Sequence, residues 1–160
     1  MTAKSRGALR VVATPIGNLG DLSPRAAEAL RTASVVLCED TRHSRPLLDR
    51  VGATGRALSC HAHNESARID EVVAALERGD DVALITDAGS PALSDPGGRI
   101  VEAVAARGLK VEVLPGPSAL VAALMGAGID TARFAFLGFL PRRGRARRAL
   151  LAEVVRAGFA

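Results

Sequence analysis

The chain has 160 residues, 48% of them hydrophobic and 24% charged, so it can bury the core of one ordinary domain, or of one domain plus part of another. No apolar run approaches the ~20 residues that cross a bilayer, and the N-terminus lacks the apolar core of a signal peptide. Two cysteines, Cys38 and Cys60, are too few for a disulfide framework and match no zinc spacing. These features predict a cytoplasmic protein with reduced thiols and no membrane segment.

Charge is distributed unevenly along the chain. The 21 basic and 17 acidic residues give a net charge of +4, and the excess lies at the C-terminal end. That end holds a single acidic residue, Glu153, and six arginines: Arg142, Arg143, Arg145, Arg147, Arg148 and Arg156. Such a cluster favours a phosphate-facing element that binds RNA, although the solvated start of a helix has the same composition.

Short β-branched runs alternate with amphipathic stretches along the chain. Strands are expected at 9–13, 34–38, 58–61, 82–86, 111–114 and 134–139. Helices are expected at 24–32, 41–51, from Asn64 or Ser66 to Arg78, at 99–107, from Ser118 to near Gly126, and at 145–156. Ser23 before Pro24 marks a helix start, and Gly79 marks a helix end. The alternation predicts an α/β fold with a mainly parallel sheet flanked by helices.

The aromatic residues suggest a second domain. All four phenylalanines fall in the last 27 residues, and the chain has no Trp or Tyr. One strand and one helix cannot bury both of their faces. We therefore expect a first domain at 8–131, and at 132–160 the beginning of a second α/β domain that is truncated.

Three loops that follow expected strands are rich in glycine and proline. They span 13–19, 86–97 and 114–119. Ligands of parallel α/β sheets bind beyond the carboxyl ends of the strands, so these loops could form a rigid pocket lined by main-chain groups. The alternative is that glycine and proline only punctuate connections. The P-loop, the G-x-G-x-x-G dinucleotide motif and the G-x-S-x-G elbow are all absent from the sequence.

Acids and bases gather at 38–43 and 61–65. Asp40, His61, His63 and Glu65 could orient or deprotonate a hydroxyl group, and we select Asp40 and Glu65 as candidate catalytic residues. Helix capping and an Asp40–Arg42 contact are equally open interpretations. The His-x-His pair has no evident third ligand nearby, so no metal site is expected.

Six motifs in chain order resemble one family. They are VATPIGNL at 12–19, CEDTRH at 38–43, HNE at 63–65, DAGSP at 87–91 with SDPG at 94–97, PGPSA at 115–119 and FLGFLP at 136–141. Together they resemble the ribosomal RNA small-subunit methyltransferase I family, which belongs to the tetrapyrrole-methylase-like, class III methyltransferases.

The resemblance implies an activity and a set of residues. It implies S-adenosylmethionine-dependent 2′-O-methylation of a cytidine ribose in 16S rRNA of the small ribosomal subunit, by a homodimer when full length. Pro15 would lie near the point of methyl transfer. The first domain's half of the cofactor site would consist of Asp87, Ala88, Gly89, Ser90, Pro91, Leu93, Ser94, Ser118 and Ala119. A phosphate-anchoring role would fall to Arg142, Arg143, Arg145, Arg147 and Arg148.

Family members continue for roughly another hundred residues, so weak cofactor binding and poor activity are expected of this chain alone. Two other functions are left open. The first is methylation of a small tetrapyrrole precursor, which has no need for the arginine cluster. The second is a non-catalytic RNA-binding fragment, which would bind RNA in a salt-dependent way without the cofactor.

Overall fold

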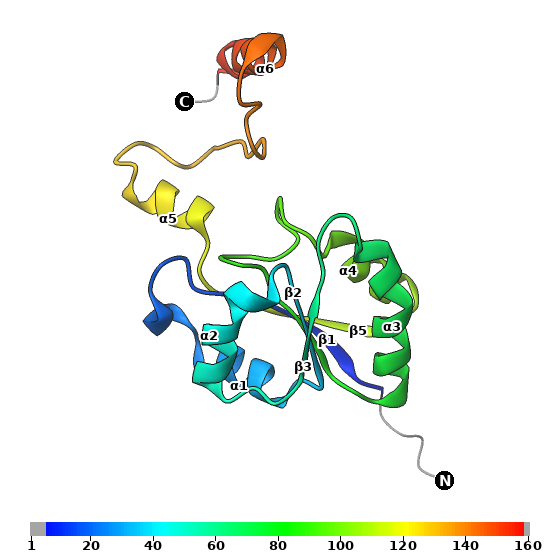
Figure 1. Cartoon of the computed structure of the whole chain (residues 1–160). Helices are drawn as coiled ribbons and strands as arrows, with labels where there is room; N and C mark the ends of the chain where they lie inside the picture. Colours follow the sequence, from blue (N-terminus) through cyan, green and yellow to red (C-terminus); the bar gives the residue numbers. More distant parts are fainter. Residues whose placement is uncertain (1–5, 159–160) are drawn as a thin grey trace. The chain divides into compact units, whose positions relative to one another are not determined.

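The computed structural model describes residues 6–158 and forms two compact units, divided between Ala119 and Leu120. The first unit is built of strands and helices in alternation (Figure 1). Its strands are β1 (Ala8–Val12), β2 (Val35–Cys38), β3 (Arg56–Ser59), β4 (Val82–Leu84) and β5 (Lys110–Leu114). Its helices are a 3-10 turn η1 (Leu19–Asp21), α1 (Pro24–Thr32), α2 (Thr41–Val51), α3 (Glu65–Arg78) and α4 (Gly98–Ala106).

The five strands form one sheet in the order β3-β2-β4-β1-β5, and every neighbouring pair is parallel. In the centre, Val11 of β1 lies opposite Leu84 of β4 and Val113 of β5. The predicted α/β class with a parallel sheet is therefore confirmed. Parallel strands place all their carboxyl ends at one edge of the sheet, which is where the glycine- and proline-rich loops begin.

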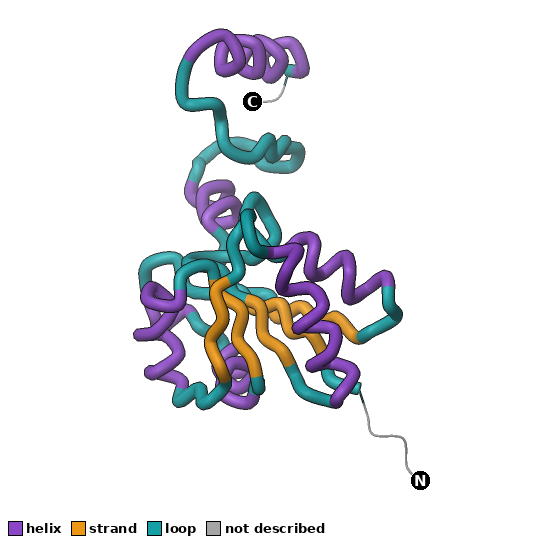
Figure 2. Tube along the Cα trace, turned by 45° about the vertical axis from the view of Figure 1, so that its right-hand side comes forward, coloured by secondary structure: helices purple, strands orange, loops and turns teal. Residues whose placement is uncertain are grey.

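Helices cover both faces of the sheet (Figure 2). Successive residues of a strand point to opposite faces, so β1 contributes Leu9 and Val11 to one core and Val12 to the other. The core under α3 and α4 includes Leu37, Leu76, Leu84, Ile100 and Val104. The core under α1 and α2 includes Leu30, Val36, Leu47, Leu48 and Ile85. Burial on both faces explains why the central strands are apolar except for Arg10 of β1, which forms an ion pair with Asp81.

Local signals set several helix ends where the sequence predicts them. The Ser23 side chain accepts a hydrogen bond from the N–H of Ala26 and begins α1. Gly79, at a φ of 93°, ends α3. Pro46 lies in the second turn of α2, where it has no N–H for the carbonyl of Arg42. None of the helices formed by the described residues is long and apolar enough to cross a membrane.

Strand β3 lies two residues earlier than the predicted 58–61. Its register with β2 pairs Val35 with Arg56 and Cys38 with Ser59. The backbone N–H of Arg56 already bonds to the carbonyl of Ser34, so pairing begins as soon as the chain reaches β2. Position in a sheet is set by the neighbouring strand, and the weak local pattern of this short segment could not indicate it.

The second unit contains helix α6 (Gly144–Ala157), and α5 (Ala119–Gly126) spans the division. The expected strand at 134–139 is wrong: those residues form no strand in the structure. A strand needs a partner for its N–H and C=O groups, and no described residue pairs with this segment. Phe134, Phe136 and Phe139 are 50%, 44% and 85% exposed. Phe159 and Ala160 lie outside the described residues, and the 8–131 and 132–160 division stays a prediction.

Candidate functional site

The three glycine- and proline-rich loops meet at the carboxyl edge of the sheet. Thr14 and Gly89 exchange backbone hydrogen bonds, with N···O distances of 2.9 and 3.1 Å, and so join the first loop to the second. The Ser90 hydroxyl donates to the carbonyl oxygen of Pro117 at 3.4 Å and joins the second loop to the third. Two main-chain hydrogen bonds and one from a side chain therefore join the three loops to one another.

This meeting point coincides with the switch point of the sheet. The chain leaves β1 through α1 on one face, and it leaves the adjacent β4 through α4 on the other face. Where neighbouring strands send their connections to opposite faces, the loops diverge and leave a crevice that binds ligands in open α/β sheets. Thr14 follows β1 and Thr86 follows β4, and the Thr14 hydroxyl donates to the Thr86 carbonyl at 3.2 Å across this point.

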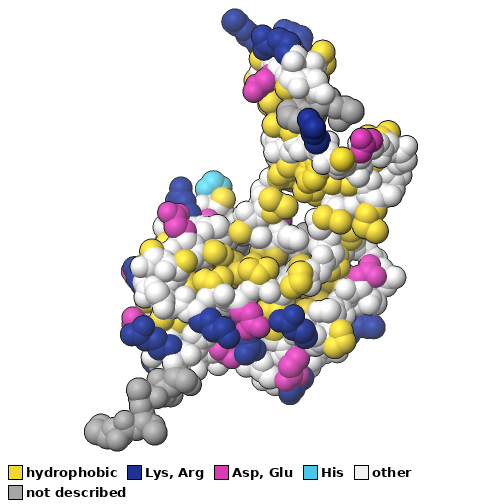
Figure 3. Space-filling view, turned by 180° about the vertical axis from the view of Figure 1, so that it is seen from behind, with side chains coloured by type: hydrophobic (Ala, Val, Ile, Leu, Met, Phe, Trp, Pro, Cys, Tyr) yellow, Lys and Arg dark blue, Asp and Glu magenta, His cyan; other side chains and the backbone are white. Residues whose placement is uncertain are grey.

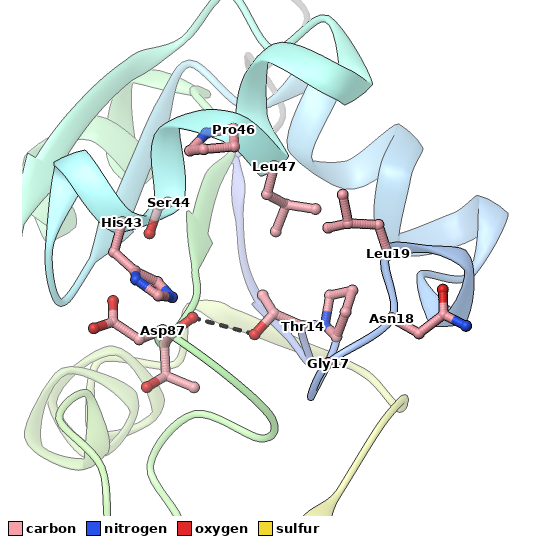
Figure 4. Close-up of a pocket in the computed structure, with 11 residues that line it drawn as sticks. Thr14, Gly17, Asn18, Leu19, His43, Ser44, Pro46, Leu47 and Asp87 are labelled. Atoms are coloured by element: carbon pink, nitrogen blue, oxygen red, sulfur yellow. Dashed lines mark hydrogen bonds between the residues drawn. The ribbon is translucent and has the colours of Figure 1, made fainter.

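A pocket of about 190 Å³ lies at the switch point (Figure 4). It is lined by residues of the first loop, of α2 and of the segment after β4: Thr14, Pro15, Gly17, Asn18, Leu19, His43, Ser44, Pro46, Leu47, Thr86 and Asp87. Two of the predicted cofactor residues, Pro15 and Asp87, belong to this lining. The sequence reasoning missed the contribution of α2, because only the packing of that helix brings His43 and Ser44 to the sheet edge.

The other predicted cofactor residues follow the pocket along the second and third loops. Gly89 and Pro91 are buried, Ser90 is half-buried, and Ala88, Leu93 and Ser94 are exposed. Ser118 and Ala119 end the third loop. Ala92 and Ser94 have φ values of 65° and 62°, a left-handed conformation that residues other than glycine adopt at a penalty. Backbone strain of this kind is common at ligand sites, which makes the second loop a candidate part of one.

Asp40 is the residue before α2 and caps that helix. Its carboxylate accepts from the backbone N–H of Arg42 at 2.8 Å and from the Arg42 guanidinium at 2.9 Å. These hydrogen bonds lower the pKa of Asp40 to about 2. A carboxylate with so low a pKa is a weak base at neutral pH. The catalytic assignment of Asp40 stays a prediction, and the geometry gives this residue a capping role.

Arg42→Ala is expected to raise the pKa of Asp40 from about 2, while leaving it below the ordinary value because the backbone N–H at position 42 still donates. The lowered pKa means that this pair stabilises the fold above the unfolded-state pKa of an Asp, and that the contribution is lost as the pH falls toward 2. Carboxyl-carbon NMR across a pH titration measures this shift. Arg45→Ala, which removes the partner of Asp49 one turn later, is the control and should leave the Asp40 titration unchanged.

Glu65 is buried at the start of α3 and reaches the start of α4. Its Oε1 accepts from the backbone N–H of Gly97 at 3.0 Å and from that of Arg99 at 2.7 Å. The first N–H groups of a helix have no partner within the helix, and this carboxylate supplies one from another element. The structure therefore gives Glu65 a structural task, and its catalytic assignment stays a prediction.

Two further carboxylates near Thr86 were missed as candidates. Glu39 is the first residue after β2, within the motif at 38–43, and the Thr86 hydroxyl donates to it at 3.5 Å. Burial raises the pKa of Glu39, and the charges of Asp87 and Asp95 add to the rise. Burial also raises the pKa of Asp95. The signal in the sequence for Glu39 was its position directly after an apolar strand, whereas Asp95 lies inside a loop and gave no such signal.

The predicted RNA-binding arginines lie at the start of α6 and just before it. All five are exposed, and within residues 6–158 none of them forms an ion pair: Arg142, Arg143, Arg145, Arg147 and Arg148. Lys and Arg side chains gather visibly on this helix (Figure 3). Cations at a helix N-terminus are opposed by the helix dipole, so the arrangement does not stabilise the helix itself.

Fold and site together define a class. The parallel five-stranded sheet, with glycine- and proline-rich loops at its carboxyl edge, is that of a methylase. The chain belongs to the tetrapyrrole methylase family, because the family model described as Tetrapyrrole (Corrin/Porphyrin) Methylases matches residues 8–159. Among solved structures, the crystal structure of uroporphyrin-III-C-methyltransferase from Thermus thermophilus is similar, with a TM-score of 0.60 and 26% identity. The match covers 78% of this chain and 54% of that one.

Among curated relatives, the chain is 51% identical over 142 residues to the Ribosomal RNA small subunit methyltransferase I of Xylella fastidiosa, covering 89% of this chain and 52% of the relative. It is 48% identical over 150 residues to the protein of the same name from Pseudomonas aeruginosa, covering 94% of this chain and 53% of that relative. The resemblance carried by the motifs is thereby confirmed. The chain spans about half the length of the curated relatives it matches.

Proposed function

We propose that the chain acts in S-adenosylmethionine-dependent 2′-O-methylation of a cytidine ribose in 16S rRNA of the small ribosomal subunit. The observation that carries this proposal is the joining of three glycine- and proline-rich loops at the switch point of a methylase-family sheet. The names of the relatives at 48% and 51% identity support an rRNA acceptor over a tetrapyrrole precursor. The arginine cluster on α6 supports the same choice, because a small acceptor offers no row of phosphates.

The loop residues fit the cofactor. Gly89 uses both its N–H and its C=O on Thr14, so the second loop keeps one shape, and a side chain at its φ of 86° would be strained. Ala88 to Pro91, with Leu93, Ser94, Ser118 and Ala119, would hold the cofactor beside Pro15, and Asp87, which the sequence also assigned to the cofactor, lines the adjoining pocket. S-adenosylmethionine supplies a methyl group already activated by a sulfonium, so the chain's main contribution is alignment, which can lower a barrier by up to about 7–11 kcal/mol in ideal cases.

A carboxylate can assist the ribose hydroxyl, which is a weak nucleophile at neutral pH. Asp40 and Glu65 remain the proposals from the sequence. The raised pKa of Glu39 makes it a stronger proton acceptor than Asp40, whose pKa is about 2. Glu39 is half-buried near the pocket lining through its contact with Thr86. Glu39 is therefore a third candidate, beside Asp40 and Glu65, to hold the proton of the hydroxyl group.

The remaining parts of the proposal concern assembly. The five arginines before and within α6 anchor rRNA phosphates, and the full-length protein acts as a cytoplasmic homodimer. Exposed apolar side chains in the second unit, such as Phe139 at 85% and Val155 at 79%, support a covering partner surface there.

Methyl transfer to ribosomal subunits tests the proposed function. Small subunits from a strain that lacks the modification are incubated with the chain and with S-adenosylmethionine carrying a labelled methyl group. We expect label in 16S rRNA, at a low level because this chain alone is expected to be poorly active, recovered after nuclease digestion as 2′-O-methylcytidine, and none in large subunits. Label on a base, or transfer only to a tetrapyrrole precursor, would contradict the proposal.

The triple change Arg145→Ala, Arg147→Ala and Arg148→Ala is expected to weaken binding to small subunits and to reduce the slope of log affinity against log salt by about 3, one for each lost phosphate contact. Filter binding over a salt series measures this slope. Arg133→Ala, an exposed arginine of the same unit outside the cluster, is the control and should leave the slope unchanged. An unaltered slope in the triple variant rules out the anchoring role.

A further inference from the structure

The pocket at the switch point has a lining suited to a flat, polar-edged ligand. Its apolar side chains are Pro15, Leu19, Pro46 and Leu47, and its polar ones include His43, Ser44 and Asp87. Figure 4 shows that the side chains of His43 and Ser44 point from α2 toward the side of the pocket where Asp87 lies. We propose that this pocket holds the cytosine base of the acceptor nucleotide, with the Asp87 carboxylate accepting a hydrogen bond from the exocyclic amino group. This inference rests on the proposed function, since the base belongs to the nucleotide that is methylated.

The volume of the pocket limits what enters it. Sites that enclose a whole drug-sized ligand measure about 300–1,000 Å³. At about 190 Å³, this pocket suits a single-ring base and is too small for an entire nucleoside. Enzymes that modify nucleotides commonly turn the target out of its stack and hold the base between apolar walls, with hydrogen bonds to its edge. The ribose would then lie at the mouth of the pocket, where Pro15 is.

Ser44 gives an independent sign of a ligand. The residue is only 4% exposed; its Oγ makes no hydrogen bond of ordinary geometry among the described residues, and the Cys38 sulfur, a weak hydrogen-bond partner, lies beside it. Buried hydroxyl groups in proteins are almost always paired, so a hydroxyl whose neighbour is only a thiol can take a further partner from the pocket that it lines. The carbonyl oxygen of a pyrimidine can supply an acceptor for this hydroxyl.

Asp87 provides the choice between pyrimidines. Its Oδ1 accepts from the backbone N–H of Asp40 at 3.3 Å, which ties it to the start of α2. Its Oδ2 has no hydrogen-bond partner among residues 6–158. A carboxylate accepts from the N4 amino group of cytosine. Uracil presents a carbonyl oxygen at the same position, and two acceptors would face each other. The pocket therefore selects cytosine over uracil.

Asp87→Asn tests the proposal by inverting the polarity of one group. The amide oxygen can keep the bond from Asp40 N–H, which leaves the amide N–H₂ to face the pocket as a donor. Saturation-transfer NMR with cytidine and uridine measures binding. The wild-type chain is expected to bind cytidine about tenfold more tightly than uridine, within the range of a single base-edge contact, and Asp87→Asn to prefer uridine. Asp95→Asn is the control: it changes a carboxylate of the same loop that does not line the pocket, and should keep the cytidine preference.

Ser44→Ala provides a second test that does not depend on the fold of the Asp87 variant. It should weaken both nucleosides and leave their ratio unchanged. Equal binding of the two nucleosides by the wild-type chain, or an unchanged ratio in Asp87→Asn, overturns the proposal. Competition between cytidine and S-adenosylhomocysteine also overturns it, because the pocket would then belong to the cofactor. Failure of methyl transfer to rRNA with the cytidine preference intact contradicts the proposed function and leaves the pocket assignment standing.

Discussion

Gly97→Ala is expected to lower the free energy of unfolding by about 2–6 kcal/mol, combining a left-handed backbone penalty of about 1–3 kcal/mol with overpacking of about 1–3 kcal/mol. Gly97 has a φ of 114°, and a Cβ there would lie 2.6 Å from Cδ2 of Leu84, a buried residue of β4. Urea denaturation followed by circular dichroism measures the change.

The neighbouring glycine is a matched control for this prediction. Gly98 begins α4, and a Cβ at that position meets no atom within 4 Å. Gly98→Ala should therefore be neutral, or stabilising by up to ~1 kcal/mol through helix propensity. Equal stabilities for the two variants would mean that the conformation of Gly97 has no energetic role.

Glu65→Ala is expected to lower the free energy of unfolding by about 2–4 kcal/mol, because two backbone N–H groups at the start of α4 lose their acceptor. Both bonds, from Gly97 and from Arg99, end on the same oxygen, Oε1. Glu65→Gln keeps that oxygen and removes only the charge, so its loss should be about 1 kcal/mol or less, the size of a helix-dipole interaction. Chemical denaturation measures both variants.

Asp70→Ala, an exposed position on the same helix, is the control for the change of charge on α3 and should alter stability by less than about 0.5 kcal/mol. The Gln variant also separates two roles of Glu65. A structural carboxylate leaves the Gln variant stable and active in methyl transfer, whereas a catalytic base leaves it stable and inactive. A large stability loss in both the Ala and the Gln variants would contradict the hydrogen-bonding account.

The sequence predicted those parts of the fold that depend on short-range signals. Ser23 with Pro24 located the start of α1, and Gly79 located the end of α3, because caps act within one turn. The strand at 134–139 was predicted from its own apolar and aromatic residues alone, and no described residue supplies the partner that a strand requires. The register of a strand depends on the neighbouring strand with which it pairs, so the sequence of one strand alone does not determine it.

The loops of the candidate site could be predicted from the sequence, but the roles of Glu65 and Ser44 could not. Glycine and proline after an apolar run predicted each loop. In the structure, hydrogen bonds of Thr14, Gly89 and Ser90 join the three loops. The task of Glu65 could not be foreseen, since its partner Gly97 lies 32 positions later in the chain. The position of Ser44 in the pocket could not be predicted either, because α2 reaches the pocket only through packing of Leu47 and Leu48 on the sheet.

The reciprocal bridge between Thr14 and Gly89 has a consequence for binding kinetics. Two loops from adjacent strands are locked before any ligand arrives, so little loop entropy remains to be lost on association. A preorganised rim of this kind favours rigid docking over induced fit, and differences in affinity among ligands should then appear mainly in their dissociation rates.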